Sequence, residues 1–580
     1  MAYRAKSLTD QVVEKIDEQR RRRSGDLILE LDLTEPLVEE VPHDPVSAVL
    51  ARRKTPRHVV LEGLRRAGND PRVRALVVKL GGARPGLALA TAQELRDAVR
   101  ALRDNDKLTI AWAETFGEVD RGSVPYYLAS AFDEVWLQPS GDLCVNGVAV
   151  EVPFLRGALD KLGVTPEVAQ RHEYKNAANV FTEREFTAAH REATERLVES
   201  ATEQLVSGIA AGRDLDPADV RVLADRAPLF APEALEAGLV DHLGYRDEVY
   251  AAVRDRFGDD AVLRFVGRYS RDGRSKLTAL SHRVMQRERQ AVAVIHVTGP
   301  IHLGRRGRQP LARDNAGSET VTAALRSATE AQDVKAIVLR VNSPGGSYVA
   351  SDSIWRQVQL TREAGKPVVA SMGDVAASGG YYVSMGADVV VAEPGTITGS
   401  IGVLSGKAVI DGLVDRLGIG HEGVAGTRHG LMFSPLRRFS DDEWQRLNAW
   451  LDRIYDDFVT KVAAGRRLPP DHVQEVARGR VWTGADAQDR GLVDELGGLG
   501  AAIDLARERA ALPPSDEPEI VAYPRTPLVT RLRPPTSSED PAAATAQVRV
   551  DAWGTFGDLA SHLGLPAHGP LMLPGDIRLR

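Results

Sequence analysis

Short apolar runs alternate with amphipathic segments along most of the chain. In one stretch the apolar runs are residues 336–341, 367–372 and 389–392, and residues 350–362 between the first two are amphipathic. Continuous apolar runs are typical of strands buried on both faces of a parallel sheet, and amphipathic segments of the helices that cover it. This order predicts an α/β fold with parallel sheets and right-handed crossovers.

The same pattern is present twice. The matched segments are 27–36 with 292–301, 73–80 with 334–341, Tyr126 with Tyr381, and Gly238 with Gly491. The last two offsets are 381 − 126 = 255 and 491 − 238 = 253. A nearly constant offset over several patterned segments indicates two homologous domains.

The repeat divides the chain into five predicted segments. They are a helical, basic N-terminal segment 1–24, a first copy 25–250, a charged connection 251–289, a second copy 290–510 and a proline-rich, partly disordered tail 511–580. In each copy an S/T-x-x-E motif, beginning at Thr182 and at Ser440, predicts the start of a long helix.

Composition removes several classes of function. The chain has 580 residues and a net charge of -7, which argues against nucleic acid as a partner because a binder needs a basic face. Cys144 is the single cysteine, so an internal disulfide and a cysteine metal cluster are excluded. The sequence has no run of about 18 apolar residues, so we expect no transmembrane segment or signal peptide, a cytoplasmic location, and at most peripheral membrane contact.

Candidate chemistry lies where the copies differ. Only the second copy has two loops with paired glycines after apolar strands, residues 342–346 (NSPGG) and 373–382 (GDVAASGGYY). The carboxyl ends of parallel strands meet at one edge of a sheet, so we expect both loops to face one crevice. Ser378 would begin a helix there as a nucleophile, with an oxyanion hole formed by the Gly379 amide and that of Gly346 or Gly345.

The first copy has a serine at the equivalent position. An offset of 255 places Ser123 opposite Ser378, but Val124 and Pro125 replace the two glycines. Proline has no N–H to donate to an oxyanion, so we expect Ser123 to be inert.

The nucleophile needs a base, and neither glycine loop of the second copy contains histidine. Lys175 lies in a loop of the first copy, and 175 + 255 = 430 falls on Gly430, so the second copy lacks this lysine. Burial can lower a lysine pKa towards neutrality, and the neighbouring Ala177, Ala178 and Val180 are apolar. Lys175 is therefore a candidate general base for Ser378.

Four motifs of the second copy together resemble the S49 serine peptidases. They are residues 342–346 (NSPGG), 377–381 (ASGGY), 398–402 (TGSIG) and 481–485 (VWTGA). The two-copy layout resembles the long form of the signal peptide peptidases in this family. The resemblance assigns Ser378 as nucleophile, Lys175 as base and Ser400 as the residue that positions the lysine.

The resemblance also implies tandem ClpP/crotonase-like domains, a homotetramer, and cleavage of short apolar peptides such as signal peptides, without a metal or cofactor. Three alternatives remain: His429, beside the position equivalent to Lys175, as the base; a crotonase-type acyl-CoA enzyme; and a scaffold without activity. The S-G-G segment and the distant lysine argue against the acyl-CoA enzyme, and the intact Ser378 and Lys175 against the scaffold.

Overall fold

The computed structural model describes residues 25–35, 37–40, 55–81, 87–118, 122–272, 290–306, 315–513, 519–524 and 571–572. The predicted N-terminal helical segment 1–24 lies outside these residues. No helix in these ranges has the length and apolar character needed to cross a membrane.

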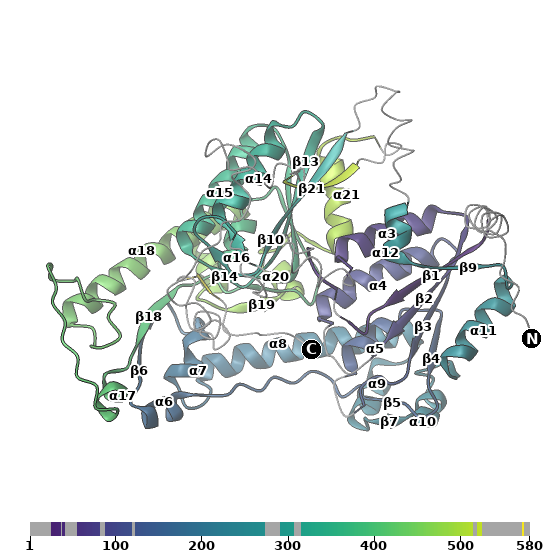
Figure 1. Ribbon diagram of the computed structural model, residues 1–580, viewed down its shortest axis with the longest axis horizontal. Helices are drawn as coiled ribbons and strands as arrows, with labels where there is room; N and C mark the ends of the chain where they lie inside the picture. The colour runs from purple at the N-terminus through teal and green to yellow at the C-terminus, as the bar shows by residue number, and fades with distance from the viewer. Residues whose placement is uncertain are drawn as a thin grey trace, which may run out of the picture.

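Each copy is built on a six-strand parallel arrangement with the same strand order (Figure 1). The first sheet runs β8 (His242–Leu243), β4 (Glu134–Leu137), β3 (Leu108–Ala113), β2 (Val73–Leu80), β1 (Leu27–Asp32) and β9 (Val262–Phe265). The corresponding strands of the second are β20 (Glu495–Leu496), β16 (Val389–Ala392), β15 (Val368–Ala377), β13 (Val334–Ser343), β10 (Ala291–Thr298) and β21 (Glu519–Tyr523). The prediction of two tandem α/β domains with parallel sheets is confirmed.

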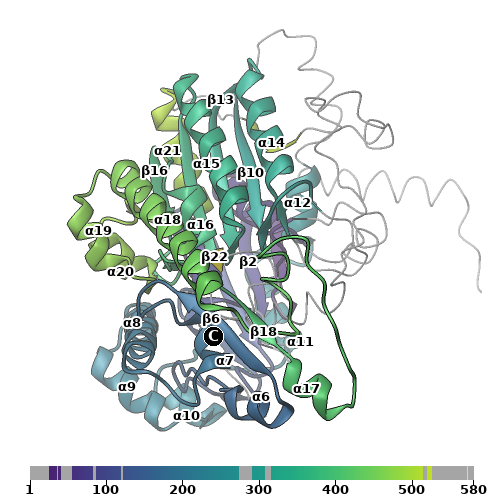
Figure 2. The same cartoon turned by 90° about the vertical axis from the view of Figure 1, so that its left-hand side faces the viewer.

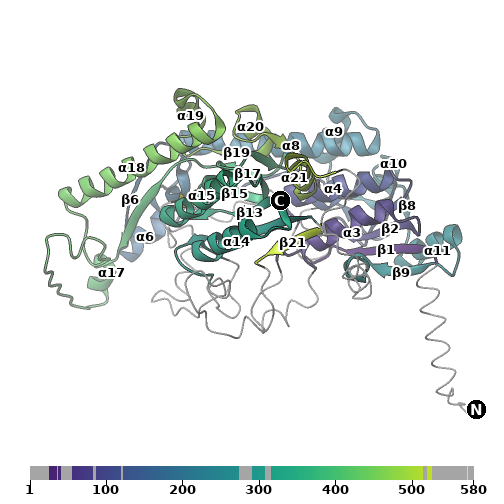
Figure 3. The ribbon, with the colours of Figure 1, turned by 90° about the horizontal axis from the view of Figure 1, so that it is seen from above.

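Helices cover both sheets. In the first copy these include α3 (Arg57–Asn69), α4 (Leu89–Arg103), α5 (Ser123–Ala129), α11 (Arg246–Phe257) and α12 (Val266–Asp272). In the second they include α14 (Ser318–Glu330), α15 (Tyr348–Glu363), α16 (Gly379–Ser384) and α21 (Leu499–Arg509). Seen from above, the two copies lie side by side, with α4 next to the second copy (Figure 3).

Equivalent hydrogen bonds support the duplication independently of strand order. The Tyr126 hydroxyl donates to the Leu239 carbonyl at 2.6 Å, and the Tyr381 hydroxyl donates to the Leu492 carbonyl at 3.0 Å. These two residue pairs match at the same offsets as the sequence repeat. The buried tyrosines therefore fasten the same loop to the same helix in both copies.

Two segment boundaries differ from those expected. Residues 251–272, expected in a charged connection, include β9, which pairs with β1 in the first sheet. Residues 519–523, expected in the tail, form β21, which pairs with the equivalent strand β10. Each copy thus continues past its expected end into an edge strand, β9 or β21, and in the first copy α12 follows that strand.

The predicted helix start at Ser440 is confirmed, but the one at Thr182 is wrong. Ser440 caps α18 (Asp441–Arg466) through a complete capping box with Glu443. The matching helix α8 (Ala188–Arg213) is instead capped by Thr187, whose side chain accepts from the His190 amide. The Thr182 hydroxyl donates to the Ala178 carbonyl at 3.2 Å, within the short helix α7 (Asn179–Thr182).

A two-stranded ribbon joins the copies outside the main sheets. Strand β6 (Thr165–Gln170) of the first copy pairs antiparallel with β18 (Leu404–Val409) of the second. With α6 (Arg156–Leu162), α17 (Asp411–Arg416) and α18, the ribbon forms an arm at the left of Figure 1. Each strand of the ribbon adjoins a loop with a candidate site residue.

Candidate active site

Ser378 lies between the end of β15 and the start of α16. Its side chain is buried, and its backbone has φ 55° and ψ -112°, a conformation that is unfavourable for a residue with a side chain. Its amide donates to the Gly399 carbonyl at 2.8 Å, and its carbonyl accepts from the Tyr382 amide at 2.9 Å. A strained backbone held by its surroundings is common at reactive groups, including serine nucleophiles on strand-to-helix turns.

The glycines next to Ser378 allow close approach of the neighbouring loop. A Cβ atom on Gly379 would lie 3.0 Å from both the Gly345 Cα and the Gly346 nitrogen. The Gly345 amide donates to the Ser343 side chain at 3.1 Å. The two predicted glycine loops therefore meet beside Ser378.

Lys175 reaches this point from the first copy. Its Nζ lies 2.9 Å from Ser378 Oγ, 2.9 Å from Ser400 Oγ and 3.0 Å from the Ser400 carbonyl oxygen. The side chain is fully buried, and this burial lowers the pKa of Lys175 to about 7. All three predicted side chains thus lie together within one chain.

The arm explains how a residue of the first copy is held against the second. Gln170 at the end of β6 pairs with Leu404 at the start of β18, and the Arg171 amide donates to the Val403 carbonyl at 2.9 Å. Lys175 follows Arg171 by four residues, and Ser400 precedes Leu404 by four. The ribbon therefore fixes the lysine loop and the Ser400 loop relative to each other.

Two glycines, Gly402 and Gly479, pack against Lys175. Gly402 belongs to a motif noted in the sequence, and a Cβ atom there would lie 3.3 Å from Lys175 Cδ. Gly479, which the sequence analysis missed, has φ 84° and lies against the Lys175 backbone. Its only sequence signal is its place two residues before the 481–485 motif.

A buried ionic network near the site was also missed. Arg340 contacts Glu94 at 2.8 Å and Glu39 at 3.5 Å, and Arg57 contacts Asp374 at 2.8 Å. The nearby arginines offset the desolvation of Glu39 and hold its pKa at about 2. These groups come from both copies and from distant positions, so no local motif identifies them.

Comparisons with known proteins agree with the motifs. The model of peptidase family S49 matches residues 101–258 and 361–513. The chain belongs to peptidase family S49. It is therefore a serine-type peptidase.

Individual relatives of this S49 peptidase can be aligned with most of its chain. It is 30% identical over 484 residues to the chloroplastic serine protease SPPA of Arabidopsis thaliana, covering 83% of this chain and 68% of the relative. It is 31% identical over 467 residues to Protease 4 of Haemophilus influenzae, covering 79% and 73%. A ClpP1 mutant from Listeria monocytogenes matches 39% of this chain and 99% of its own with 14% identity and a TM-score of 0.23, too low to support an argument.

Ser123 of this S49 peptidase has different surroundings from Ser378. It is buried at the start of α5, where its hydroxyl lies 3.4 Å from Asn146 Oδ1 and accepts from the Gly147 amide at 3.0 Å. Lys175, by contrast, contacts Ser378. The inertness of Ser123, expected because Val124 and Pro125 replace the two glycines, stays a prediction.

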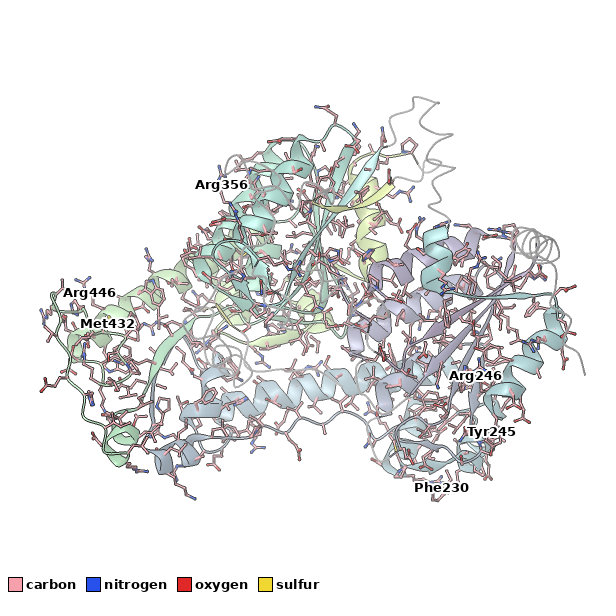
Figure 4. All side chains as sticks on the ribbon, viewed as in Figure 1. Phe230, Tyr245, Arg246, Arg356, Met432 and Arg446 are labelled. Atoms are coloured by element: carbon pink, nitrogen blue, oxygen red, sulfur yellow. The ribbon has the colours of Figure 1, made fainter. Side chains whose placement is uncertain are left out.

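His429 lies in the loop between α17 and α18, away from α16. Its Nε2 is 3.0 Å from Asp442 Oδ2, and nearby Met432 marks the outer end of the arm in Figure 4. The structure thus brings Lys175, and not His429, to Ser378. Among the described residues, no group of three or more His, Cys, Asp or Glu side chains is arranged to bind a metal ion.

Proposed function

We propose that this S49 peptidase hydrolyses peptide bonds with Ser378 as nucleophile and Lys175 as general base. The observation that carries the proposal is the distance of 2.9 Å between Lys175 Nζ and Ser378 Oγ at a fully buried position. In the part of the chain that the structure describes, no carboxylate pairs with Lys175. Burial without such a partner favours the neutral amine, which is the form that can accept a proton.

The reaction has two steps. Neutral Lys175 takes the proton from Ser378 Oγ as this oxygen attacks the peptide carbonyl, and the resulting ammonium group then protonates the leaving amine. Water, deprotonated by the same lysine, attacks the acyl carbon, and the ammonium group then returns the proton to Ser378 Oγ as the bond between this oxygen and the acyl carbon breaks and the second product leaves. Ser400 keeps the amine in place through its hydroxyl and its carbonyl.

The oxyanion hole in this proposal consists of the Gly346 and Gly379 amides. Gly346 is favoured over Gly345 because the Gly345 amide already donates to Ser343. Each backbone donor aimed at the developing negative charge contributes about 3–4 kcal/mol to acyl transfer.

The proposed substrate and assembly rest on the resemblance, and the proposed location rests on the lack of a long apolar run in the sequence. We propose short apolar peptides such as cleaved signal peptides as substrates, a homotetramer as the working form, and a cytoplasmic enzyme with at most peripheral membrane contact. Membership in a peptidase family favours this function over an acyl-CoA enzyme or an inactive scaffold. The mass of the purified protein in solution tests the tetramer.

Hydrolysis of a fluorogenic peptide panel tests the dyad. Ser378→Ala and Lys175→Ala should each lower kcat/KM by about 10³-fold or more, whereas Ser123→Ala should retain activity. Circular dichroism checks that each variant is folded. Activity that survives Lys175→Ala but is lost in His429→Gln would transfer the role of base to His429.

A further inference from the structure

One carboxylate oxygen on α18 accepts hydrogen bonds from two other helices. The Tyr348 hydroxyl donates to Asp457 Oδ2 at 2.8 Å, and the Tyr382 hydroxyl donates to the same oxygen at 2.7 Å. Tyr348 is the first residue of α15, and Tyr382 lies in α16, where it is fully buried. Figure 2 shows these helices next to one another. Asp457 therefore joins α15, α16 and α18 at a single atom.

Both tyrosines lie close in the chain to the proposed oxyanion donors. Tyr348 follows Gly346 by two residues, and Tyr382 follows Gly379 by three. The two glycines are in contact, since a Cβ atom on Gly379 would lie 3.0 Å from the Gly346 nitrogen. Oxyanion donors act only within a narrow range of distances from the developing charge. A displacement of α15 relative to α16 would therefore change the spacing of the two amides.

A lysine completes the network. Lys461 Nζ lies 2.9 Å from Asp457 Oδ2, 2.8 Å from the Tyr382 hydroxyl and 2.6 Å from Asp352 Oδ1. Desolvation raises the pKa of Asp457, but the hydrogen bonds from Tyr382 and Lys461 outweigh it and hold this pKa below its usual value. The ionised carboxylate is a stronger acceptor than a neutral group, so the tyrosine hydroxyls are held by charge-assisted hydrogen bonds.

The first copy has other residues in place of the carboxylate and the lysine. Helices α8 and α18 match along their whole length, with 441 − 188 = 253 at the start and 466 − 213 = 253 at the end. This offset places Gln204 opposite Asp457 and Gly208 opposite Lys461. The Gln204 amide donates to the Pro394 carbonyl at 3.1 Å. The two charged groups are thus found only in the copy that has the paired glycines.

The first copy nevertheless retains one of the tyrosines. Tyr127 matches Tyr382 at the offset of 255, and its ring lies against α8, because a Cβ atom on Gly208 would lie 2.1 Å from Tyr127 Cε2. The position of Tyr348 is occupied by Leu87, since 334 − 73 = 261 and 348 − 261 = 87. Packing of the ring is therefore common to both copies, whereas the shared carboxylate is specific to the second.

We propose that Asp457 is a positioning residue, which fixes α15 relative to α16 and so sets the spacing of the two amides in the proposed oxyanion hole. The inference rests on the proposed function, because this spacing affects the rate only if an oxyanion forms beside Ser378. Asp457 acts through Tyr348 and Tyr382 rather than on the substrate. Oxyanion donors bind the transition state more strongly than the bound substrate, so the effect should fall on kcat and not on KM.

Hydrolysis of a fluorogenic peptide by Asp457→Ala tests the proposal. We expect kcat to fall about 10- to 100-fold with KM unchanged, as for a small misplacement of catalytic groups. Asp457→Asn keeps an acceptor oxygen and should recover part of the rate. Asp456 is the next residue along α18 and is exposed, so Asp456→Ala is the matched control and should keep full kcat. Equal kcat in the two alanine variants would overturn the proposal.

Removal of single hydroxyl groups tests the link in a milder way. Tyr348→Phe and Tyr382→Phe keep both rings, so they remain informative if Asp457→Ala does not fold. Each should lower kcat about tenfold, and the double variant should lose less than the product, because either change breaks the same link. Tyr127→Phe, the matched control in the first copy, should keep full kcat. Single losses that multiply in the double variant would overturn the linking role of Asp457.

An inhibitor that resembles the transition state separates positioning from a general loss of structure. When an N-acetylated trileucine aldehyde reacts, Ser378 Oγ adds to its carbonyl carbon, the serine proton passes to Lys175, and the carbonyl oxygen becomes an oxyanion. In Asp457→Ala the inhibition constant should rise by the factor by which kcat falls. The pH profile should keep its midpoint near 7, because Lys175 is not moved.

The outcomes distinguish this inference from the proposed function. An unchanged inhibition constant in Asp457→Ala, or a pH midpoint that moves with the loss of kcat, would overturn the positioning role while the wild type remains an active peptidase. Absence of hydrolysis by the wild type would overturn the proposed function, and this inference with it.

Discussion

Gly479 lies directly against the backbone of Lys175. A Cβ atom on Gly479 would lie 2.5 Å from both the Lys175 nitrogen and the Lys175 Cβ, and Gly479 has φ 84°. Its amide also donates to the Ile401 carbonyl at 2.8 Å, next to Ser400. This glycine therefore contacts both the lysine loop and the Ser400 loop.

Gly479→Ala should impair catalysis by moving Lys175. The methyl group must displace the lysine backbone, and a shift of about 1 Å at a catalytic group can lower the rate by about 10²-fold. Gly365→Ala is the matched control, since Gly365 has φ 82° and open space around its Cβ position. Both variants incur backbone strain at positive φ, and Gly479→Ala adds the clash with Lys175, so it should lose more stability and it alone should lose kcat. Equal kcat in the two variants would contradict this positioning role.

The pH dependence of hydrolysis should report on Lys175. Burial lowers the pKa of this lysine to about 7, and only the neutral amine can act as the base. We therefore expect kcat/KM to rise about tenfold per pH unit below pH 7 and to level off above it. His429→Gln should leave this profile in place. A profile that rises only near pH 10 would mean that the base is an ordinary solvated lysine.

Burial of Lys175 should also cost stability in a pH-dependent way. Between about pH 7 and 10.5 the unfolded chain holds a proton that the folded chain lacks, so stability rises with pH across this window. Lys175→Met removes this proton, and its Tm should exceed that of the wild type most near pH 7 and least near pH 10. Lys161→Met, at an exposed position, should show no such trend in thermal unfolding.

Ser400 should act through the lysine. Its hydroxyl lies 2.9 Å from Lys175 Nζ, and its backbone has φ 51°. Ser400→Gly removes the hydroxyl and suits this backbone, so it should lower kcat about 10- to 100-fold through misplacement of the amine. The rising limb of the pH profile should also move to lower pH, because the ammonium form loses an acceptor. Ser400→Cys should restore part of the rate, whereas a rate unchanged in Ser400→Gly would exclude the role.

The duplication made Ser378 and Lys175 candidates because a duplicated chain provides its own comparison, and the resemblance to S49 peptidases then assigned their roles. The glycines present in one copy and the lysine present in the other marked where the two had diverged. Their contact could not be derived from spacing, because it depends on the pairing of β6 with β18. Neither strand is buried at most of its positions, so neither has the apolar pattern that identifies the central strands.

The failure to predict β9 and β21 from the sequence has a similar cause. Strand β9 reads VLRF and β21 reads EIVAY, and both are short, partly exposed edge strands. A short run of mixed polarity does not differ from a loop in its hydrophobic pattern. The tertiary pairing of each with a central strand decides its structure, and that pairing is not visible locally.

Arg340 provides a test of how the two copies are held together. It is fully buried on β13, and it contacts Glu94 and Glu39 of the first copy together with the Ser371 hydroxyl of the second at 2.9 Å. Arg340→Met would leave these carboxylates buried with less compensation, which typically costs about 3–5 kcal/mol. The denaturation midpoint in urea should fall accordingly.

Arg356→Met is the matched control for this prediction. Arg356 projects from α15 (Figure 4), where its pair with Glu363 has both side chains more than half exposed. Loss of an exposed pair typically costs less than about 1 kcal/mol, so its midpoint should change little. If Arg340→Met matched this control, the buried network would contribute little to stability, and other contacts such as the β6–β18 ribbon would hold the copies together.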